Sequence, residues 1–88
     1  MKTKTEIIDG IKIETVVNEN GYKIFKVKIS NIDTFFRCSS HCVSTGYDVD
    51  QVVYDLKHDD YNFEANCYWV QNIKECKNSL VEWALNTK

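Results

Sequence analysis

The first half of the chain is organised around residues 11–29, IKIETVVNENGYKIFKVKI. Apolar and polar side chains alternate on both sides of Asn20 and Gly21, and this two-residue period is typical of half-buried β-strands. A two-residue turn at Asn20-Gly21 would place Ile13 opposite Lys28 and mix the faces. A three-residue loop, with Gly21 left-handed in a bulge, keeps one face apolar. We therefore predict a hairpin with the pairs Ile11–Ile29, Ile13–Val27 and Thr15–Phe25.

Two flanking segments extend this hairpin into a meander. Asp9-Gly10 is a turn signal, so a short strand is expected around Glu6 to Ile8. The segment from Thr34 to Cys38 is predicted to add a strand after the hairpin. The first half therefore predicts three or four antiparallel strands.

The segment that follows has the features of a helix that begins at Asp48. Asp48 can cap the first turn, and Gln51 can reach back to it as a capping box requires. Apolar residues then fall at i, i+3, i+4 and i+7, the spacing of one buried helical stripe: Val49, Val52, Val53 and Leu56. We predict a helix here, ending near Asp59 and Asp60, with its carboxylates away from that stripe.

The last third predicts a strand followed by a helix. Residues 61–69 alternate, with Tyr61, Phe63, Ala65, Cys67 and Trp69 on the apolar side. Asn72 with Glu75 supplies an N-cap where the period changes. One long helix over about 64–86 is the alternative, and Ser79 with Glu82 is a second possible helix start. Trp69 and Trp83 are both expected to be packed.

These segments together predict one α+β domain over residues 1–88. An N-terminal antiparallel β-meander of three to four strands would pack against two helices, in the order β-β-β-(β)-α-β-α. With 43% hydrophobic residues and no low-complexity tract, the chain can build a single core. The first residues lack the apolar run of a signal peptide, so a cytoplasmic location with reduced thiols is expected.

The cysteines provide zinc-binding atoms without zinc-binding spacing. Cys38 and Cys42, with His41 between them, form one close pair, whereas eight residues separate Cys67 from Cys76. We predict no metal and no cofactor, and we expect the thiols to be buried or incidental.

The sequence also favours a non-catalytic protein. Cys42, His58 and Asp59 are the residue types of a thiol nucleophile, a base and an orienting carboxylate. No recognised catalytic motif accompanies them, so no catalytic residue is predicted.

Charge is the main functional clue. Residues 33–64 carry seven acids against Arg37 and Lys57, a local charge of −5, although the whole chain has a net charge of −2. A row of carboxylates can imitate nucleic-acid phosphates and attract a basic groove by ion pairing. The predicted contact residues are Asp48, Asp50, Asp55, Asp59, Asp60 and Glu64, with Tyr54 and Tyr61 as anchors. The expected partner is a basic, nucleic-acid-binding host protein, and the alternative is a solvated acidic face that only aids solubility.

A second hypothesis is direct nucleic-acid binding by the strands. Lysines and aromatic residues there would combine phosphate contacts with base stacking: Lys12, Lys23, Lys26 and Lys28 with Tyr22 and Phe25. The sequence pI of 5.6 and the absence of a known motif argue against it. An exposed strand edge would also permit a homodimer.

In size and composition the chain resembles small products of bacteriophages and mobile elements, which are proline-poor and rich in Lys, Asn and Ile. Anti-CRISPR and other anti-defence proteins are frequent in that group. The resemblance implies a stoichiometric inhibitor of a host protein. It covers composition and length only, so no functional residue is carried over.

Overall fold

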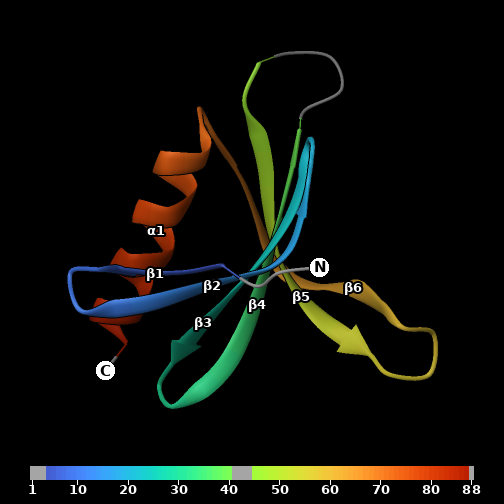
Figure 1. The fold of residues 1–88 in the computed structure, drawn as a ribbon, viewed down its shortest axis with the longest axis horizontal. Helices are drawn as coiled ribbons and strands as arrows, with labels where there is room; N and C mark the ends of the chain where they lie inside the picture. Colours follow the sequence, from blue (N-terminus) through green and yellow to red (C-terminus); the bar gives the residue numbers. More distant parts are fainter. Residues whose placement is uncertain (1–3, 41–44, 88) are drawn as a thin grey trace.

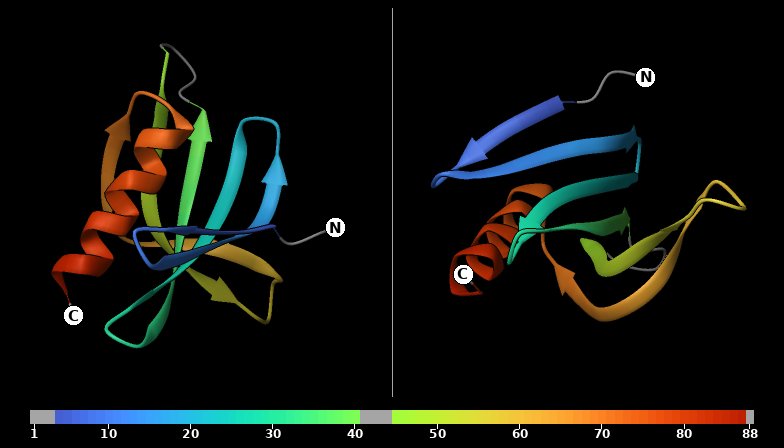
Figure 2. Two further views of the ribbon diagram at one scale, coloured as in Figure 1. Left: turned by 60° about the vertical axis from the view of Figure 1, so that its left-hand side comes forward. Right: turned by 90° about the horizontal axis from the view of Figure 1, so that it is seen from below.

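The computed structural model describes residues 4–40 and 45–87, which form one antiparallel sheet and one helix (Figure 1). The six strands lie in the sheet in the same order as in the chain. Helix α1 covers one face of the sheet (Figure 2), and we call the opposite face the outer face. The elements are β1 (Lys4–Ile8), β2 (Ile11–Glu19), β3 (Tyr22–Ile29), β4 (Ile32–Ser40), β5 (Tyr47–Asp55), β6 (Asp60–Val70) and α1 (Ile73–Asn86).

This architecture corrects the predicted element order. The described residues contain six strands and one helix, not three to four strands and two helices. The strands expected at 34–38 and 61–69 are confirmed as parts of β4 and β6. The helix predicted from Asp48 is wrong, because those residues form β5.

The helical spacing in β5 comes from burial on both faces of a strand. Val49 pairs with Cys38 and belongs to the core beneath α1. Val52 is also buried but pairs with Phe35 on the outer face. Residues three apart on a strand point to opposite sides, so two buried faces imitate one helical stripe. Leu56 lies beyond the strand and is exposed.

The first hairpin is confirmed in two of its three predicted pairs and wrong in its loop, and the recorded β2–β3 pairing does not include Ile11 with Ile29. Ile13 faces Val27 and Thr15 faces Phe25, as predicted. The turn nevertheless has two residues, Asn20 and Gly21, and the extra residue is a bulge at Val16. The bulge restores the apolar register, but it lies within β2 and not at Gly21 in the loop, where we expected it. The predicted turn at Asp9-Gly10 is present, with both residues at positive φ.

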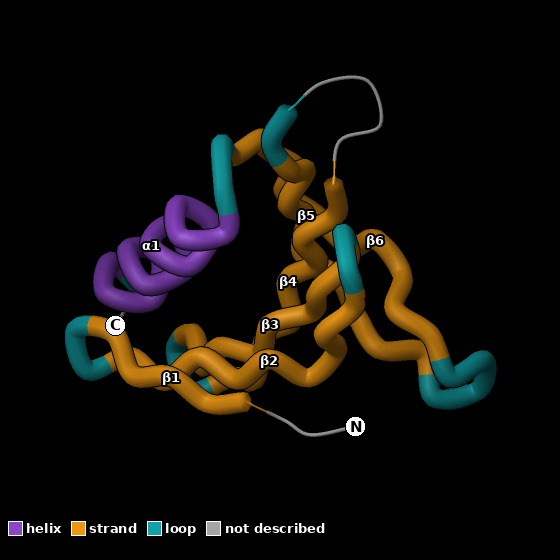
Figure 3. Tube along the Cα trace, turned by 45° about the horizontal axis from the view of Figure 1, so that its top comes forward, coloured by secondary structure: helices purple, strands orange, loops and turns teal. Residues whose placement is uncertain are grey.

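The core lies between the sheet and α1 (Figure 3). Its fully buried side chains include Phe25, Phe36 and Cys38 from the sheet and Cys76 and Leu80 from the helix. Trp83 packs on Phe36 with ring centroids 5.4 Å apart, as expected.

Trp69 does not join the core as we predicted. It is 50% exposed, and it pairs with Asp48 on the outer side of β6. Its ring covers Gly46, where a Cβ atom would come within 2.4 Å of the indole. The indole Nε1 donates to the carbonyl of Thr45 over 3.2 Å.

Helix α1 begins where the sequence predicted. The Asn72 side chain accepts a hydrogen bond from the Glu75 N–H at 2.8 Å, and Glu75 in turn accepts one from the Gln71 N–H at 3.1 Å. The helix runs unbroken past Ser79, so the second start is wrong. The Ser79 hydroxyl instead hydrogen-bonds Tyr68 of β6 at 2.6 Å. At 14 residues, α1 is too short and too polar to cross a membrane.

The N-cap gives a stability prediction. Asn72→Ala should lower the free energy of unfolding by about 1 kcal/mol, because the Glu75 N–H loses its acceptor. For a domain of this size that is a fall of roughly 4–8 °C in Tm. Asn78→Ala is the matched control, since Asn78 is exposed within the helix and alanine favours helix there. Equal losses in the two variants would show that the cap contributes nothing.

Candidate interaction surface

The end of the β5–β6 hairpin extends beyond the rest of the sheet (Figures 1 and 2). Strand β4 pairs with β5 only as far as Phe35 opposite Val52. Past that point β5 pairs with β6 alone, through Tyr54 opposite Tyr61 and Asp55 opposite Asp60. We call residues 54–61 the hairpin tip.

The hairpin tip gathers half of the predicted acidic residues. Asp55, Asp59 and Asp60 lie within it, beside both predicted anchors, Tyr54 and Tyr61. The other three, Asp48, Asp50 and Glu64, do not. Asp48 pairs with Trp69 near the far end of the hairpin, seven residues or roughly 23 Å along the strand from Asp55. The predicted single row of carboxylates on a helix is therefore wrong.

Asp50 is a structural residue and not part of an exposed surface. It is 7% exposed and accepts two hydrogen bonds from Arg37, at 2.6 and 3.2 Å. The same guanidinium donates to the Tyr61 carbonyl at 3.4 Å, so it joins β4, β5 and β6. The hydrogen bond with Asp50 raises the pKa of Arg37, although burial opposes the shift. A buried pair of this kind holds its partners in place but leaves no charge for a ligand.

Glu64 is held by a side-chain network around two irregularities of β6. Asn66 and Glu64 are the unpaired residues where the register with β5 shifts. The Gln51 amide donates to Glu64 at 3.2 Å and accepts from Asn66 at 3.1 Å. Asn66 has a φ of 57°, which asparagine tolerates well. The Gln51 side chain is therefore hydrogen-bonded to the bulge residue at each irregularity, Glu64 and Asn66.

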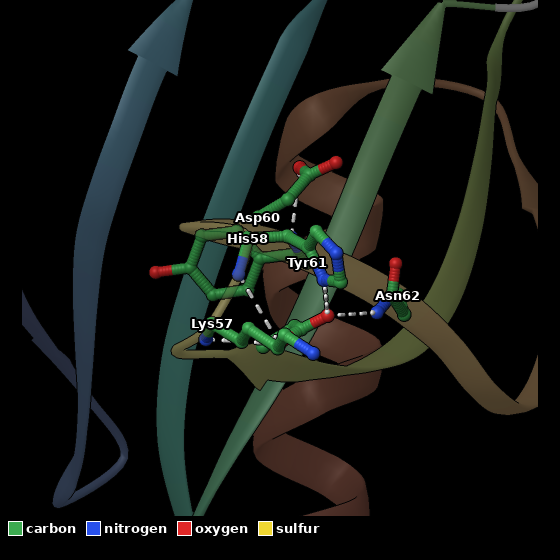
Figure 4. Close-up of polar contacts among 6 residues, drawn as sticks. Lys57, His58, Asp60, Tyr61 and Asn62 are labelled. Carbon is green, nitrogen blue, oxygen red and sulfur yellow. Dashed lines mark hydrogen bonds and ion pairs between the residues drawn. The ribbon is translucent and has the colours of Figure 1, made fainter.

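Hydrogen bonds within the turn fix the carboxylates of the hairpin tip (Figure 4). Asp55 accepts from the Lys57 N–H at 3.0 Å, from Asn62 at 3.4 Å and contacts His58 Nδ1 at 2.6 Å. The hydrogen bond from His58 is the main reason that the pKa of Asp55 is lowered. Asp60 accepts from the Tyr61 N–H at 2.8 Å. These contacts orient the carboxylates without neutralising all of them.

Aromatic rings form the base of the hairpin tip. The Tyr61 ring lies 5.1 Å from Tyr54 and 5.6 Å from Phe35, centroid to centroid. The Tyr54 hydroxyl donates to Asp59, and this hydrogen bond raises the pKa of Tyr54. Burial and the nearby charge of Asp59 raise the pKa of Tyr61. Rings beside carboxylates present both stacking and ion-pairing groups to a cation.

The charge of the hairpin tip is largely uncompensated. Among the ion pairs of residues 4–40 and 45–87, Asp55 with His58 is the only one that involves Asp55, Asp59, Asp60 or Glu64. Lys57 is the one lysine in this turn. A projecting group of carboxylates with one nearby lysine should carry a negative local potential.

The lysines of the first strands lie apart from the hairpin tip. Lys12 and Lys26 both approach Glu14 on the outer face, at 3.8 Å. Phe25, which direct nucleic-acid binding would need as a stacking ring, is fully buried beneath α1. Lys23 hydrogen-bonds Asn18 instead.

The cysteines divide by burial. Cys38 and Cys76 lie in the core, where their mutual hydrogen bond raises the pKa of Cys76 and lowers that of Cys38. Cys67 is exposed on β6. His41 and Cys42 lie outside the described residues. In the described part of the chain, no three His, Cys, Asp or Glu residues come close enough together to hold a metal ion.

Sequence reasoning missed Arg37, the residue that positions the hairpin. It is the only arginine in the chain, and it lies on a strand whose register with β5 could not be assigned while β5 was predicted as a helix. The available signal was the single arginine itself, because arginine is the residue most suited to a buried ion pair.

The phenol contacts predict a pH effect. In Asp59→Asn the pKa of Tyr54 and Tyr61 should fall towards the ordinary value, because Asp59 favours the neutral phenol in both. A raised folded pKa means that this stabilisation is complete below the unfolded tyrosine pKa and is lost as pH rises through the folded pKa. The measurement is an alkaline titration followed by phenolate absorbance, with Tyr54→Phe to assign the transitions. Tyr68, whose pKa is raised mainly by burial, should titrate unchanged. Unaltered curves for all tyrosines would contradict the Tyr54–Asp59 contact.

Comparison with known proteins assigns no family to the chain. No protein-family model matches it, and neither the curated proteins nor the solved structures contain a significant match.

Proposed function

We propose that this chain is a small non-catalytic binding module that captures a basic, nucleic-acid-binding protein through its hairpin tip. The observation that carries the proposal is the projecting group of Asp55, Asp59 and Asp60, whose only ion-pair partner among the described residues is His58. Tyr54 and Tyr61 lie directly beside these carboxylates. The surface therefore suits a cationic partner.

Imitation of nucleic acid is the mode of action that fits this surface. A groove that binds phosphates with Lys and Arg gains the same charge-assisted hydrogen bonds from carboxylates. Binding then blocks the groove and falls steeply as salt rises, because counterions are released on association. The resemblance in composition to phage and mobile-element products supports an inhibitor of a host defence protein.

The bulges of β6 favour the hairpin tip over other acidic sites as the contact point. Bulges bend a strand and increase its twist. Here they lie between Asp50 and Val52 of β5, directly before the hairpin leaves the sheet. The carboxylates are thus carried away from the sheet, where a concave partner surface can reach them.

Direct binding of nucleic acid is the competing proposal, and the same experiment separates the two. The lysines on the outer face support it, but Glu14 contacts two of them and Phe25 is buried. Stacking platforms need exposed rings beside the cations.

The test is capture from a bacterial lysate with immobilised wild-type protein and the variant Asp55→Asn, Asp59→Asn, Asp60→Asn. Wild type should retain basic proteins at low salt and release them at high salt or with added double-stranded DNA. The variant should lose this capture and keep its fold by circular dichroism, because Asp59 and Asp60 are exposed and an asparagine at position 55 keeps an oxygen that can accept from the Lys57 N–H.

A second triple variant controls for net charge. Asp9→Asn, Glu19→Gln and Glu82→Gln removes the same charge from exposed positions away from the hairpin tip. Asparagine also tolerates the positive φ at position 9. Capture should survive in this control. Equal loss in both variants, or full capture by the tip variant, would reject the hairpin tip as the contact surface, and salt-dependent retention of DNA by wild type would favour the competing proposal.

A further inference from the structure

The sheet opens into a notch between β4 and β5. Residues 32–34 of β4 pair with β3 only, and residues 53–55 of β5 pair with β6 only. Each segment therefore has one edge without a neighbouring strand among the described residues. Edges of this kind are templates for another extended chain.

The notch is a groove of about 400 Å³ that is lined mainly by apolar and aromatic side chains and by two carboxylates. Ile32 is 67% exposed and Val53 46% exposed, from β4 and β5 respectively. Phe35 and Tyr54 contribute aromatic rings, and Asp33 and Glu64 contribute carboxylates. None of the side chains that line it belongs to a lysine or an arginine.

We propose that this notch binds an extended, arginine-bearing segment of the partner protein. This inference rests on the proposed function and adds to it a second contact with a defined chemistry. The partner's backbone would hydrogen-bond the unpaired edges of β4 and β5, as in strand addition. Its alternate side chains would enter the groove, with an arginine between Asp33 and Glu64.

Charge and shape both favour arginine as the occupant. Glu64 and Asp33 both line the groove and complement a positive side chain, and Phe35 and Tyr54 offer ring faces. Asp33 also faces Lys28 of β3, so Glu64 is the less compensated of the two carboxylates. A guanidinium is planar, stacks on aromatic rings and bonds carboxylates with two parallel N–H groups. A lysine ammonium provides the charge, but it is not planar and cannot bond a carboxylate through two parallel N–H groups. The groove volume is at the low end for ligand sites, so it suits one or two side chains of a peptide.

The probe is a synthetic peptide, Val-Arg-Val-Arg-Val, compared with versions in which lysine or citrulline replaces arginine. Binding is measured by NMR titration of the folded protein and by amide hydrogen exchange. With the arginine peptide, amides at 32–34 and 53–55 should shift and exchange more slowly. The lysine peptide should bind about tenfold more weakly, which equals the loss of one charge-assisted hydrogen bond. The citrulline peptide, which keeps the shape without the charge, should bind more weakly than either.

Two variants of β4 test the site without touching the hairpin tip. Asp33→Asn should weaken the arginine peptide about two- to fivefold, the range for an exposed ion pair. Ile32→Lys should abolish binding, because it places a cation in the groove. Ile7→Lys adds the same charge at another exposed isoleucine and should leave the affinity unchanged.

The outcomes separate this inference from the proposed function. Shifts confined to residues 56–61, equal affinity for the arginine and lysine peptides, or no effect of Ile32→Lys would overturn the notch and leave the hairpin tip untouched. Shifts at the notch when the protein is concentrated without peptide would also overturn it, in favour of a second copy of the chain as occupant. Peptide binding at the notch together with full lysate capture by the tip variant would uphold the notch and reject the tip.

Discussion

The contact between Arg37 and Asp50 is the constraint on which the arrangement of the second half depends. It crosses from β4 to β5 on the outer face, and through the Tyr61 carbonyl it also reaches β6. Removing Arg37 would leave the buried carboxylate of Asp50 without its ion-pair partner and destabilise the fold. The pair thus joins β4 to β5 and, through Tyr61, to β6 at the base of the hairpin tip.

This arrangement gives the sheet apolar contacts on two sides. The larger core lies beneath α1, and Ile24 and Val52 are buried outside it. Phe35, Tyr54 and Tyr61 continue the second group of apolar contacts towards the hairpin tip. Strand β5 lies between the two groups, which is why its valines are buried in both directions. The hairpin tip and the notch both lie at the edge of this second group of apolar contacts.

Local patterns predicted the segments whose burial is one-sided, such as residues 11–15 of β2 and 25–29 of β3. The β2–β3 pairs Ile13–Val27 and Thr15–Phe25 followed from simple alternation, and the α1 cap followed from Asn72 and Glu75. The patterns failed where the chain is buried on both faces or changes register. Val49 and Val52 imitated a helix. Trp69 lies on the same face of β6 as Tyr61 and Phe63, as the alternation indicated, because the bulges at Glu64 and Asn66 cancel. That face is the outer one, which α1 does not cover, and Trp69 is half exposed there.

The candidate site was predicted only in part, because local patterns show which residues are acidic but not which of them tertiary contacts bury. The acidic segment was visible in the sequence, but its division depended on tertiary structure. Asp50 became a buried partner because Arg37 lies opposite it, and no local pattern indicates that pairing. Asp55, Asp59 and Asp60 remained together because one tight turn holds them, which is a local property.

The position of α1 in the chain has a consequence for synthesis on the ribosome. Every strand pairs with its neighbour in sequence, so the sheet can form hairpin by hairpin as the chain emerges. The helix that covers its apolar face comes from residues 73–86, after all six strands. Contacts that fasten it, such as Lys77 with Glu6 and Thr87 with Ser30, join parts of the chain 71 and 57 residues apart. The apolar face of the nascent sheet therefore stays exposed to solvent until the residues of the helix have been synthesised. A chaperone would be needed most during this interval.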